Sequence, residues 1–334
     1  MCQNPKCKRS FSINFNRQQS VFWIPHVDGT PFRKLGDQRG LSGAQAYNRV
    51  EAEIQQLPDN TKLTKGLCDL KAFCGRLVID GKYVAVKGFD QKIPFIWGLD
   101  YLTHDIPYGG LYPAEDEMAF SDFFQKLYDL GYDLKIVVAD DRGGLKPALN
   151  KLFPYAKLQL CHNHYLENIR RDLSIRSSPR YEHFFNSLRL HVFVEGTNEQ
   201  KITQGLMHVF YKRTEGKRML QNIVTGIKHR QTDLFNYLKI SDCPNTTNIL
   251  ESYNSHLQGR LESIKGFQSF DSARRWLNAY IIRRRTKTLT DCKGRFKPLN
   301  KHASLEFTIK KQALWPAVLK NLGINKIKSF EKTD

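Results

Sequence analysis

The stretch "LKIVVADDRGGLKPALNKLFPYAKLQLCHNH", residues 134–164, decides the fold class of this chain. It holds two short runs rich in Val, Ile and Leu on either side of a segment with helical spacing, "LKPALNKLF". A strand, a helix and a second strand in this order form the crossover unit of a parallel sheet. The sequence therefore predicts an α/β fold in which the first of these strands ends at Asp140.

Further strands are predicted upstream of this unit. Two apolar runs, "GRLVIDGKYVAV" (75–86) and "IPFIWGLDYLTH" (93–104), and a short third run near 108–112 precede the helical pattern "EMAFSDFFQKLYDLGY" (117–132). Because no helix separates the three runs, they are expected to form an antiparallel meander. The later strands join the same sheet through helical crossovers.

The chain is strongly basic. Its 334 residues include 52 Lys and Arg against 33 Asp and Glu, which gives a formal net charge of +19. This excess favours a polyanionic partner, either nucleic acid or an anionic membrane surface. No apolar run of about 18 residues is present, so no transmembrane helix is expected, and the polar first residues do not look like a secretory signal. The seven cysteines are odd in number, so we interpret them as reduced thiols or metal ligands of an intracellular, cytoplasmic protein.

Three acidic residues lie in or beside apolar segments, where a buried carboxylate is costly unless it has a partner. Asp80 lies inside an apolar strand, Asp140 ends another, and Glu251 lies near the start of a predicted helix, "TNILESYNSHL" (247–257). By strand alternation Asp80 shares a face with Val78, and Asp140 shares one with Val138, so neighbouring strands would set the two carboxylates side by side. Divalent cations, which prefer oxygen ligands, remove the repulsion between such groups. The pattern predicts a metal-dependent enzyme that acts on a DNA phosphodiester bond.

Two alternatives stay open for these acids. Asn248 and Glu251 are three residues apart, which also fits a helix capping box, and the helix dipole favours an acid in the first turn in either case. Asp141 follows Asp140 directly, so either of them could supply the second carboxylate. Strand alternation places Asp141 on the opposite face, which favours Asp140.

The region 25–60 predicts two short helices, "PFRKLGDQR" and "SGAQAYNRVEAEIQQL". Gly40 marks the turn between them, and Ser42 is placed to cap the second helix. This is the spacing of a helix-turn-helix whose second helix enters the DNA major groove, although any two amphipathic helices joined at a glycine give the same pattern. The side chains expected to contact DNA here are Arg33, Lys34, Gln45, Asn48 and Arg49.

Cys2 and Cys7 lie close together before a basic stretch, as in one half of a zinc ribbon. A tetrahedral Zn²⁺ site needs four ligands and the preceding pair is absent, so two free surface cysteines explain the spacing equally well. Zn²⁺ is expected only if the ribbon is complete in a longer protein.

Basic residues are concentrated toward the end of the chain. From Ser255 onward there are 18 Lys and Arg against six Asp and Glu, and the densest run is "ARRWLNAYIIRRRTK" (273–287). An isolated cluster of this kind is usually a solvated helix face. In a chain this basic we interpret Arg283, Arg284 and Arg285 as contacts to the phosphates of double-stranded DNA.

Four segments, taken together, resemble the DDE transposases of the Mutator-like superfamily and their bacterial insertion-sequence relatives. "VIDGKY" resembles the strand of the first acid, and "VVADDRGGLKPALNKLFPYAKLQLCHNH" resembles the block of the second acid. "NTTNILESYNSHLQGRL" resembles the helix of the third acid, and the helical stretch before it resembles the insertion that these enzymes carry. The resemblance covers about residues 75–287. Ala139 departs from it, because the family usually has Ser or Thr before the second acid.

The resemblance implies an RNase H-like catalytic core in which Asp80, Asp140 and Glu251 bind Mg²⁺, or Mn²⁺ in its place. It implies cleavage at the ends of a mobile element and transfer of the cut strand into target DNA, with no membrane and no small-molecule substrate. Joining two ends calls for at least a homodimer, and the absence of a clear nuclear localisation run favours a prokaryotic host. The expected organisation is a partial zinc-ribbon-like segment (1–20), a helix-turn-helix (25–60), the first part of the core (75–165), a helical insertion (166–245), the rest of the core (246–290) and a basic C-terminal segment (291–334).

Cys161 and His164 have the spacing of half a zinc site, but no second pair follows nearby. We therefore favour a structural role for them near the active site, by hydrogen bonding around the metal ligands. Two other functions fit the same fold: a DNA-binding protein that has lost catalysis, and a nuclease or resolvase that cuts but does not join strands.

Overall fold

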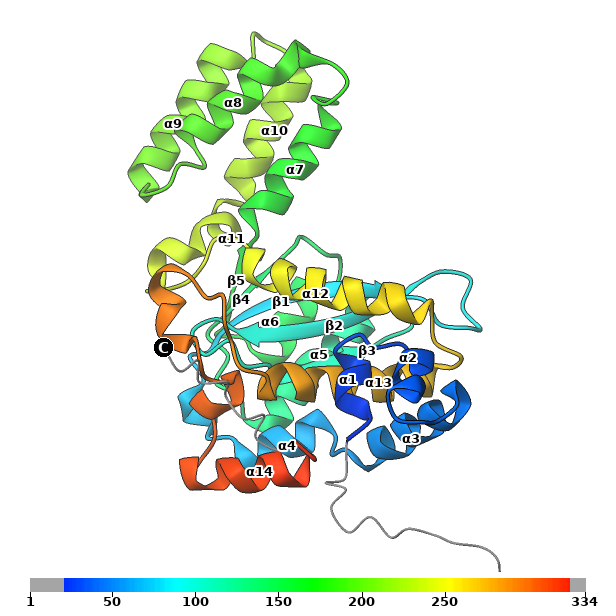
Figure 1. Ribbon diagram of the computed structural model, residues 1–334. Helices are drawn as coiled ribbons and strands as arrows, with labels where there is room; N and C mark the ends of the chain where they lie inside the picture. Colours follow the sequence, from blue (N-terminus) through cyan, green and yellow to red (C-terminus); the bar gives the residue numbers. More distant parts are fainter. Residues whose placement is uncertain (1–20, 325–334) are drawn as a thin grey trace, which may run out of the picture.

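The computed structural model describes residues 21–324 (Figure 1), so the predicted half ribbon at Cys2 and Cys7 lies outside the described residues. The strands are β1 (Arg76–Val84), β2 (Ile93–Asp100), β3 (Tyr108–Leu111), β4 (Ile136–Ala139) and β5 (Lys157–Leu160). The α-helices are α1 (Trp23–Val27), α2 (Phe32–Asp37), α3 (Gly43–Gln56), α4 (Asn60–Leu67), α5 (Glu117–Leu130), α6 (Leu145–Leu152), α7 (His162–Asp172), α8 (Glu182–His191), α9 (Glu199–Arg213), α10 (Arg218–His229), α11 (Gln231–Phe235), α12 (Asn248–Ile264), α13 (Phe270–Thr286) and α14 (Trp315–Asn321). Short 3-10 turns are η1 (Leu70–Ala72), η2 (Pro179–Tyr181), η3 (Asn236–Lys239), η4 (Gly294–Leu299), η5 (Ser304–Phe307) and η6 (Gln312–Leu314).

The five strands form one mixed sheet in the order β3-β2-β1-β4-β5. β1, β2 and β3 pair antiparallel, whereas β4 is parallel to β1 and β5 is parallel to β4. This confirms the predicted meander and the helical crossovers, and with them the α/β class. All eight residues of β2 are buried, which explains why its sequence is a continuous apolar run.

The register between β1 and β4 decides where the acids lie. Leu77 pairs with Val137, and Val78 pairs with Val138. Continuing this register brings Asp80 level with Asp140, one residue after the end of β4. Two neighbouring parallel strands therefore deliver both carboxylates to the same end of the sheet.

Helices cover both faces of the sheet (Figure 1). α12 and α13 lie in front of the strands in that view, and α5 and α6 lie behind them. The side chain of Trp97 on β2 joins the front layer, because its ring contacts those of Tyr253 on α12 and Tyr280 on α13, with ring centroids 6.1 Å apart in each case. α13 also lies so close to β3 that a Cβ on Gly109 would come within 2.9 Å of the Ile281 side chain.

The two predicted N-terminal helices form as α2 and α3. Gly40 takes a left-handed φ of 66° at the turn, and Ser42 makes a capping box with Gln45 at the start of α3. The sequence did not predict α4, which begins directly after the Pro58–Asp59 break; Asp59 is its N-cap. Whether α2 and α3 bind DNA stays a prediction.

The helices α7 to α10 project away from the sheet in Figure 1, whereas α11 lies beside β5, where the Gln159 amide donates to the carbonyl of Leu234. They leave the sheet at the end of β5 and return to it before α12. Two ion pairs join the α10–α11 region to the segment after β4, Arg230 with Asp141 and Lys146 with Asp233. No helix of residues 21–324 is both long and apolar enough to span a bilayer.

A fully buried ion pair joins parts of the chain that are far apart in sequence. Arg285 of α13 donates two hydrogen bonds of 2.8 Å to the carboxylate of Asp105, and both side chains are 0% exposed. Arg285 also donates to Asn60 and Thr64 of α4, and Thr308, which follows η5, donates to Asp105. The prediction that Arg285 contacts DNA is therefore wrong, because its guanidinium group is enclosed and saturated.

We predict that Arg285→Met lowers the free energy of unfolding by about 3–5 kcal/mol, because it leaves the Asp105 carboxylate buried without its counter-ion. Urea unfolding followed by tryptophan fluorescence measures the change. The double variant Arg285→Met/Asp105→Leu should be more stable than Arg285→Met, since it removes the uncompensated charge. A single variant within about 1 kcal/mol of the wild type would contradict this role of the pair.

His104, in the loop between β2 and β3, gives the fold a sensitivity to acid. It is buried, Nε2 has no partner among the described residues, and burial lowers the pKa of the imidazole to about 4 from the ordinary value of 6.5. Between these two values the unfolded chain binds a proton that the folded chain does not, so stability falls as the pH falls through this range.

His104→Asn should remove this effect while tolerating the left-handed φ of 55° at the position. At about 1.4 kcal/mol per pKa unit, the fall in unfolding free energy between pH 7 and pH 4 should shrink by up to about 3 kcal/mol. Denaturant unfolding at several pH values tests this. Parallel pH profiles of the variant and the wild type would show that His104 does not contribute.

Candidate active site

Asp80 lies on β1, the middle strand of the sheet, and two direct hydrogen bonds hold its carboxylate. Its Oδ1 accepts a hydrogen bond from the backbone N–H of Gly81 at 2.8 Å, and its Oδ2 accepts one from the Asn254 amide at 2.7 Å. The Oδ1 of Asn254 accepts in turn from the indole N–H of Trp97 at 2.9 Å. Burial raises the pKa of the Asp80 carboxyl, and the hydrogen bond from Gly81 and the positive charge of His164 counter part of that rise. The Asn254 bridge thus fixes α12 over β1 and orients the first acid.

Asp140 begins the turn after β4 and is 17% exposed. Its Oδ1 accepts from the backbone N–H of Asp141 at 2.7 Å, and its Oδ2 lies 3.4 Å from Nε of Arg142. Asp141 turns away and pairs with Arg230 at the end of α10. Of the two neighbouring acids, Asp141 is thus engaged by Arg230, and Asp140 is the one that the β1–β4 register brings level with Asp80.

Glu251 lies in the first turn of α12. Its Oε1 accepts a hydrogen bond of 2.8 Å from the hydroxyl of Thr247, the residue that precedes the helix. The alternative that Asn248 and Glu251 form a capping box is wrong, because α12 begins at Asn248 and no side chain caps its N-terminus. Asn248 instead accepts from the amide of Asn163 on α7. Glu251 is thus free of a capping role and is oriented by Thr247.

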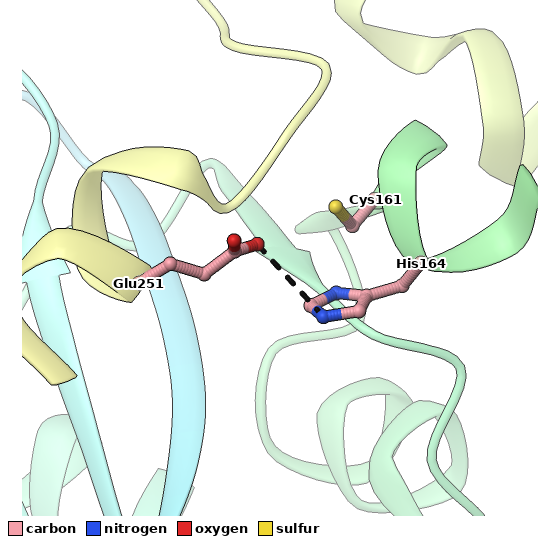
Figure 2. Close-up of side chains that lie close together, drawn as sticks. All are labelled: Cys161, His164 and Glu251. Carbon is pink, nitrogen blue, oxygen red and sulfur yellow. Dashed lines mark ion pairs between the residues drawn. The ribbon is translucent and has the colours of Figure 1, made fainter. Parts of the chain in front are cut away.

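Cys161 and His164 lie beside Glu251 at the junction of β5 and α7 (Figure 2). One ligand atom of each of the three residues lies within 4.8 Å of the others, and Nε2 of His164 is 3.8 Å from Oε1 of Glu251. The buried Thr247 connects them: its backbone N–H donates to Sγ of Cys161 at 3.3 Å, and its hydroxyl lies 3.4 Å from Nδ1 of His164.

Cys161 and His164 shift each other's pKa values in opposite directions. A hydrogen bond with Cys161 is the main reason why the pKa of His164 rises to about 9, against the effect of burial. Burial acts to raise the pKa of the Cys161 thiol, but its hydrogen bonds with His164 and Thr247 outweigh burial and lower it. The positive charge of His164 lowers the pKa of Asp80, against the effect of burial.

The three predicted acids all lie near His164. The charge of Glu251 raises the pKa of Asp80 and the charge of His164 lowers it, while the charges of Asp140 and Glu251 raise the pKa of His164, so each acid lies within electrostatic reach of this imidazole. The acids come from β1, from the end of β4 and from the start of α12. Three carboxylates beside one imidazolium form an oxygen-rich, negatively charged site of the kind that holds a hard divalent cation.

Four residues at this site were not singled out from the sequence. Asn254 and Thr247 orient the acids, as described above. Glu115, after β3, is 9% exposed at its side chain, accepts a hydrogen bond from Tyr83 and has its Oε1 3.7 Å from Nε of Arg142. Arg142 therefore lies between Glu115 and Asp140. Thr247 and Asn254 had a sequence signal, because both lie within the segment that resembles the helix of the third acid.

The predicted DNA contacts fall into two groups. Arg33, Lys34, Gln45, Asn48 and Arg49 are exposed on α2 and α3, although the Gln45 side chain also closes the cap of its own helix. Of the three consecutive arginines, Arg283 is 8% exposed and pairs with Asp28 at 2.6 Å, so it too is not available as expected. Only Arg284 keeps partial exposure without a carboxylate within 4.0 Å among the described residues.

Comparison with known proteins identifies the family of the chain. The family described as "Transposase, Mutator family" matches residues 109–287, more than half of the chain. The chain belongs to the Mutator family of transposases. The matched region includes Asp140 and Glu251 and ends just beyond α13, while β1 with Asp80 lies before it.

Two curated relatives are similar over part of their length. The chain is 23% identical over 173 residues to the transposase for insertion sequence element IS256 in transposon Tn4001 of Staphylococcus aureus, and equally to that of Enterococcus faecalis. Each match covers 51% of this chain and 43% of the relative, so it spans less than half of their length.

Two solved structures are similar at low identity. The Drosophila P element transposase strand transfer complex is 11% identical with a TM-score of 0.36, over 85% of this chain and 95% of that chain. The Mos1 transposase paired-end complex with left transposon end is 10% identical with a TM-score of 0.19, over 68% and 83%. At these TM-scores the likenesses carry no argument about this chain.

The Asn254 bridge leads to a prediction about stability. Asn254→Leu keeps the approximate size of the side chain but leaves the Asp80 carboxylate and the Trp97 N–H without their shared partner. Because an unsatisfied buried polar group costs about 1–3 kcal/mol, the free energy of unfolding should fall by at least that amount. Denaturant unfolding of Asn254→Leu, with the exposed Asn48→Leu as control, measures it. Equal stability of Asn254→Leu and the wild type would show that the bridge does not stabilise the fold.

Proposed function

We propose that this chain is a DNA transposase whose RNase H-like core cuts DNA at the ends of a mobile element and joins the cut strand to a target. The observation that carries the proposal is the β1–β4 register, which sets Asp80 level with Asp140, together with the position of Glu251 beside His164, a residue that lies near all three acids. A mixed five-stranded sheet with helices on both faces, in a member of the Mutator family, supports this interpretation. The strongly basic composition fits a DNA substrate.

The donor atoms at the site fit a hard divalent cation. Carboxylate oxygens are the ligands that Mg²⁺ takes in proteins, and Mn²⁺ accepts the same set. Asp80, Asp140 and Glu251 would hold it. When bound, such cations activate the attacking water or 3′-hydroxyl and stabilise the leaving oxygen. Cys161 offers a soft thiol, which suits neither cation, and its hydrogen bonds to Thr247 give it a positioning role instead.

The surrounding residues orient the carboxylates for binding a cation. Asn254 and the Gly81 N–H hold the Asp80 carboxylate in one orientation, and Thr247 does the same for Glu251. Thr247 has a single hydroxyl proton, so when it donates to Glu251 its backbone N–H remains to bind Cys161. His164 contributes positive charge at the edge of the site, which offsets the mutual repulsion of the acids.

The proposed function also assigns roles to the regions outside the three acids. The exposed residues of α2 and α3 are proposed to bind the ends of the element, and α7 to α11 form the insertion within the core. Joining two ends requires at least a homodimer acting on double-stranded DNA. The bacterial relatives fit a prokaryotic protein that works on the nucleoid, without a membrane or a small-molecule substrate.

The experiment uses a DNA fragment that carries both ends of the element encoding this chain, together with a target plasmid. With Mg²⁺ or Mn²⁺ the wild type should cut the ends and join them to the plasmid. Asp80→Asn, Asp140→Asn and Glu251→Gln should each lose about a hundredfold or more in cleavage, the scale of losing a group that stabilises transition-state charge. Asp141→Asn is the matched control and should remain within several-fold of the wild type.

Each outcome separates the alternatives. If Asp80→Asn cuts as well as the wild type, the assignment of the site fails. Loss of cleavage in Asp141→Asn but not in Asp140→Asn would move the second ligand by one residue. A wild type that binds the ends but shows no carboxylate-dependent affinity for metal is a DNA-binding protein without catalysis. A wild type that cuts but never joins is a nuclease or resolvase.

Arg142 should compete with the cation for Asp140. Arg142→Gln is therefore predicted to tighten the apparent Kd for Mn²⁺ by about threefold, the scale of a partly exposed ion pair. Glu115→Gln should weaken Mn²⁺ binding, because it releases Arg142 toward Asp140. Calorimetric titration measures both, with the remote Lys126→Gln as control. Weaker binding in Arg142→Gln would contradict the competition, and a Glu115→Gln effect that persists in the Arg142→Gln background would make Glu115 itself a ligand.

A further inference from the structure

A cluster of basic side chains lies where α12 approaches α13, beyond the acids. We call it the α12–α13 cluster, and it consists of His256, Arg260, Arg284 and Lys287. On α12, His256 and Arg260 are four residues apart and lie one turn and two turns beyond Tyr253. On α13, Arg284 and the following Lys287 continue the side of the helix that begins at Tyr280. The helical period therefore places His256 and Arg260 on one side of α12, and Tyr280 and Arg284 on one side of α13, with Lys287 directly after that helix.

Several contacts show that the two rows meet. The guanidinium group of Arg284 lies over the ring of Tyr253, 4.4 Å from its centroid. Burial lowers the pKa of His256, and the charges of Arg284, Arg260 and Lys287 lower it further, so all three cations lie within electrostatic reach of one imidazole. The charge of Asp291 acts on this pKa in the opposite direction, so one acid also lies near the cluster.

Two arginines of the cluster have no acidic partner among residues 21–324. Neither Arg260 nor Arg284 has a carboxylate within 4.0 Å, whereas Arg283 and Arg285, the sequence neighbours of Arg284, each have one. Within the same described part of the chain, Nε of Arg284 is buried and has no hydrogen-bond partner. Guanidinium groups without an acidic partner are placed to bind an anion.

Tyr280 provides the second, independent observation. Its side chain is only 3% exposed, and among the described residues its hydroxyl has no hydrogen-bond partner. Burial raises the pKa of this hydroxyl to about 12, and the charges of Arg284 and Arg260 act against that rise, so it lies near both arginines. A buried hydroxyl without a partner is costly unless a ligand completes it.

We propose that the α12–α13 cluster binds backbone phosphates of the DNA duplex, with Arg260 and Arg284 as the two main contacts and the Tyr280 hydroxyl as a third donor. Arg260 follows Glu251 by nine residues on one helix, so it lies about 14 Å from the third acid along α12. This distance corresponds to a few nucleotides along the DNA backbone. The phosphates bound by the cluster would therefore lie a few nucleotides from the bond that is cut. Asp28, an acid beside α13, is already engaged by Arg283 and Lys287 and leaves the two arginines uncompensated.

The inference rests on the proposed function, because it takes DNA as the substrate. Its test is therefore a binding measurement that needs no catalysis. Asp80→Asn protein is titrated with a random-sequence 30-bp duplex in the presence of EDTA, at several salt concentrations. If the acids are misassigned, binding is unaffected; if the cluster is misassigned, cleavage can still depend on Asp80, so the two failures are distinguishable.

In this assay the double variant Arg260→Gln/Arg284→Gln should reduce the slope of log K against log salt concentration by about 2, one for each phosphate that no longer meets an arginine. Arg260→Lys/Arg284→Lys keeps the charges and should keep the slope. The matched control is Arg189→Gln/Arg213→Gln, two exposed arginines of α8 and α9 with the same change in charge. An equal reduction of the slope in the test and control pairs would overturn the proposal, because the effect would then be one of net charge.

Tyr280→Phe gives a second test that involves no charge and only one atom. The variant should leave the melting temperature of the free protein unchanged or raise it, since it removes a hydroxyl that has no partner. It should weaken binding of the 30-bp duplex by about fivefold, the scale of one hydrogen bond to a charged group. An unchanged affinity would show that the hydroxyl does not contact DNA and would contradict its place in the cluster.

Discussion

The pairing of β1 with β4 is the constraint on which the candidate site depends. Because Val78 pairs with Val138, the two strands carry Asp80 and Asp140 to the same level, and a slip of this register would separate the two acids. Asn254 then fixes α12 over this pair through its hydrogen bond to Asp80, and Thr247 orients Glu251 at the start of that helix. Three distant parts of the sequence thus meet through one register and two short polar side chains.

The run of three arginines on α13 shows how one sequence pattern serves three structural purposes. Arg283 forms an ion pair with Asp28 near the surface, and Arg285 forms a fully buried ion pair with Asp105. Arg284 lies over the ring of Tyr253 and has no acidic partner among the described residues. The Arg285–Asp105 pair also gathers α4 and the segment after η5, so it joins the N-terminal helices, the core and the C-terminal segment. Stability and the proposed binding of DNA are therefore divided among adjacent residues of the same helix.

The sequence predicted features that depend on local patterns. Apolar runs separated by turns located all five strands, and an acid inside such a run located Asp80. Long-range contacts were beyond it: nothing near Arg285 in the sequence shows that Asp105, 180 residues away, buries it. The same reason explains why the approach of Glu115 to Arg142 was not anticipated. The capping-box alternative for Glu251 was wrong because α12 starts one residue earlier than the pattern needs.

The most direct test of the proposed metal site is a crystal structure of the protein with Mn²⁺, with the ion located by its anomalous scattering. We expect at least one strong peak with carboxylate oxygens of Asp80, Asp140 and Glu251 as ligands, at about 2.0–2.3 Å. An ordered site in which these three carboxylates hold no Mn²⁺ at concentrations that support cleavage, or in which the ion is bound elsewhere, would contradict the assignment.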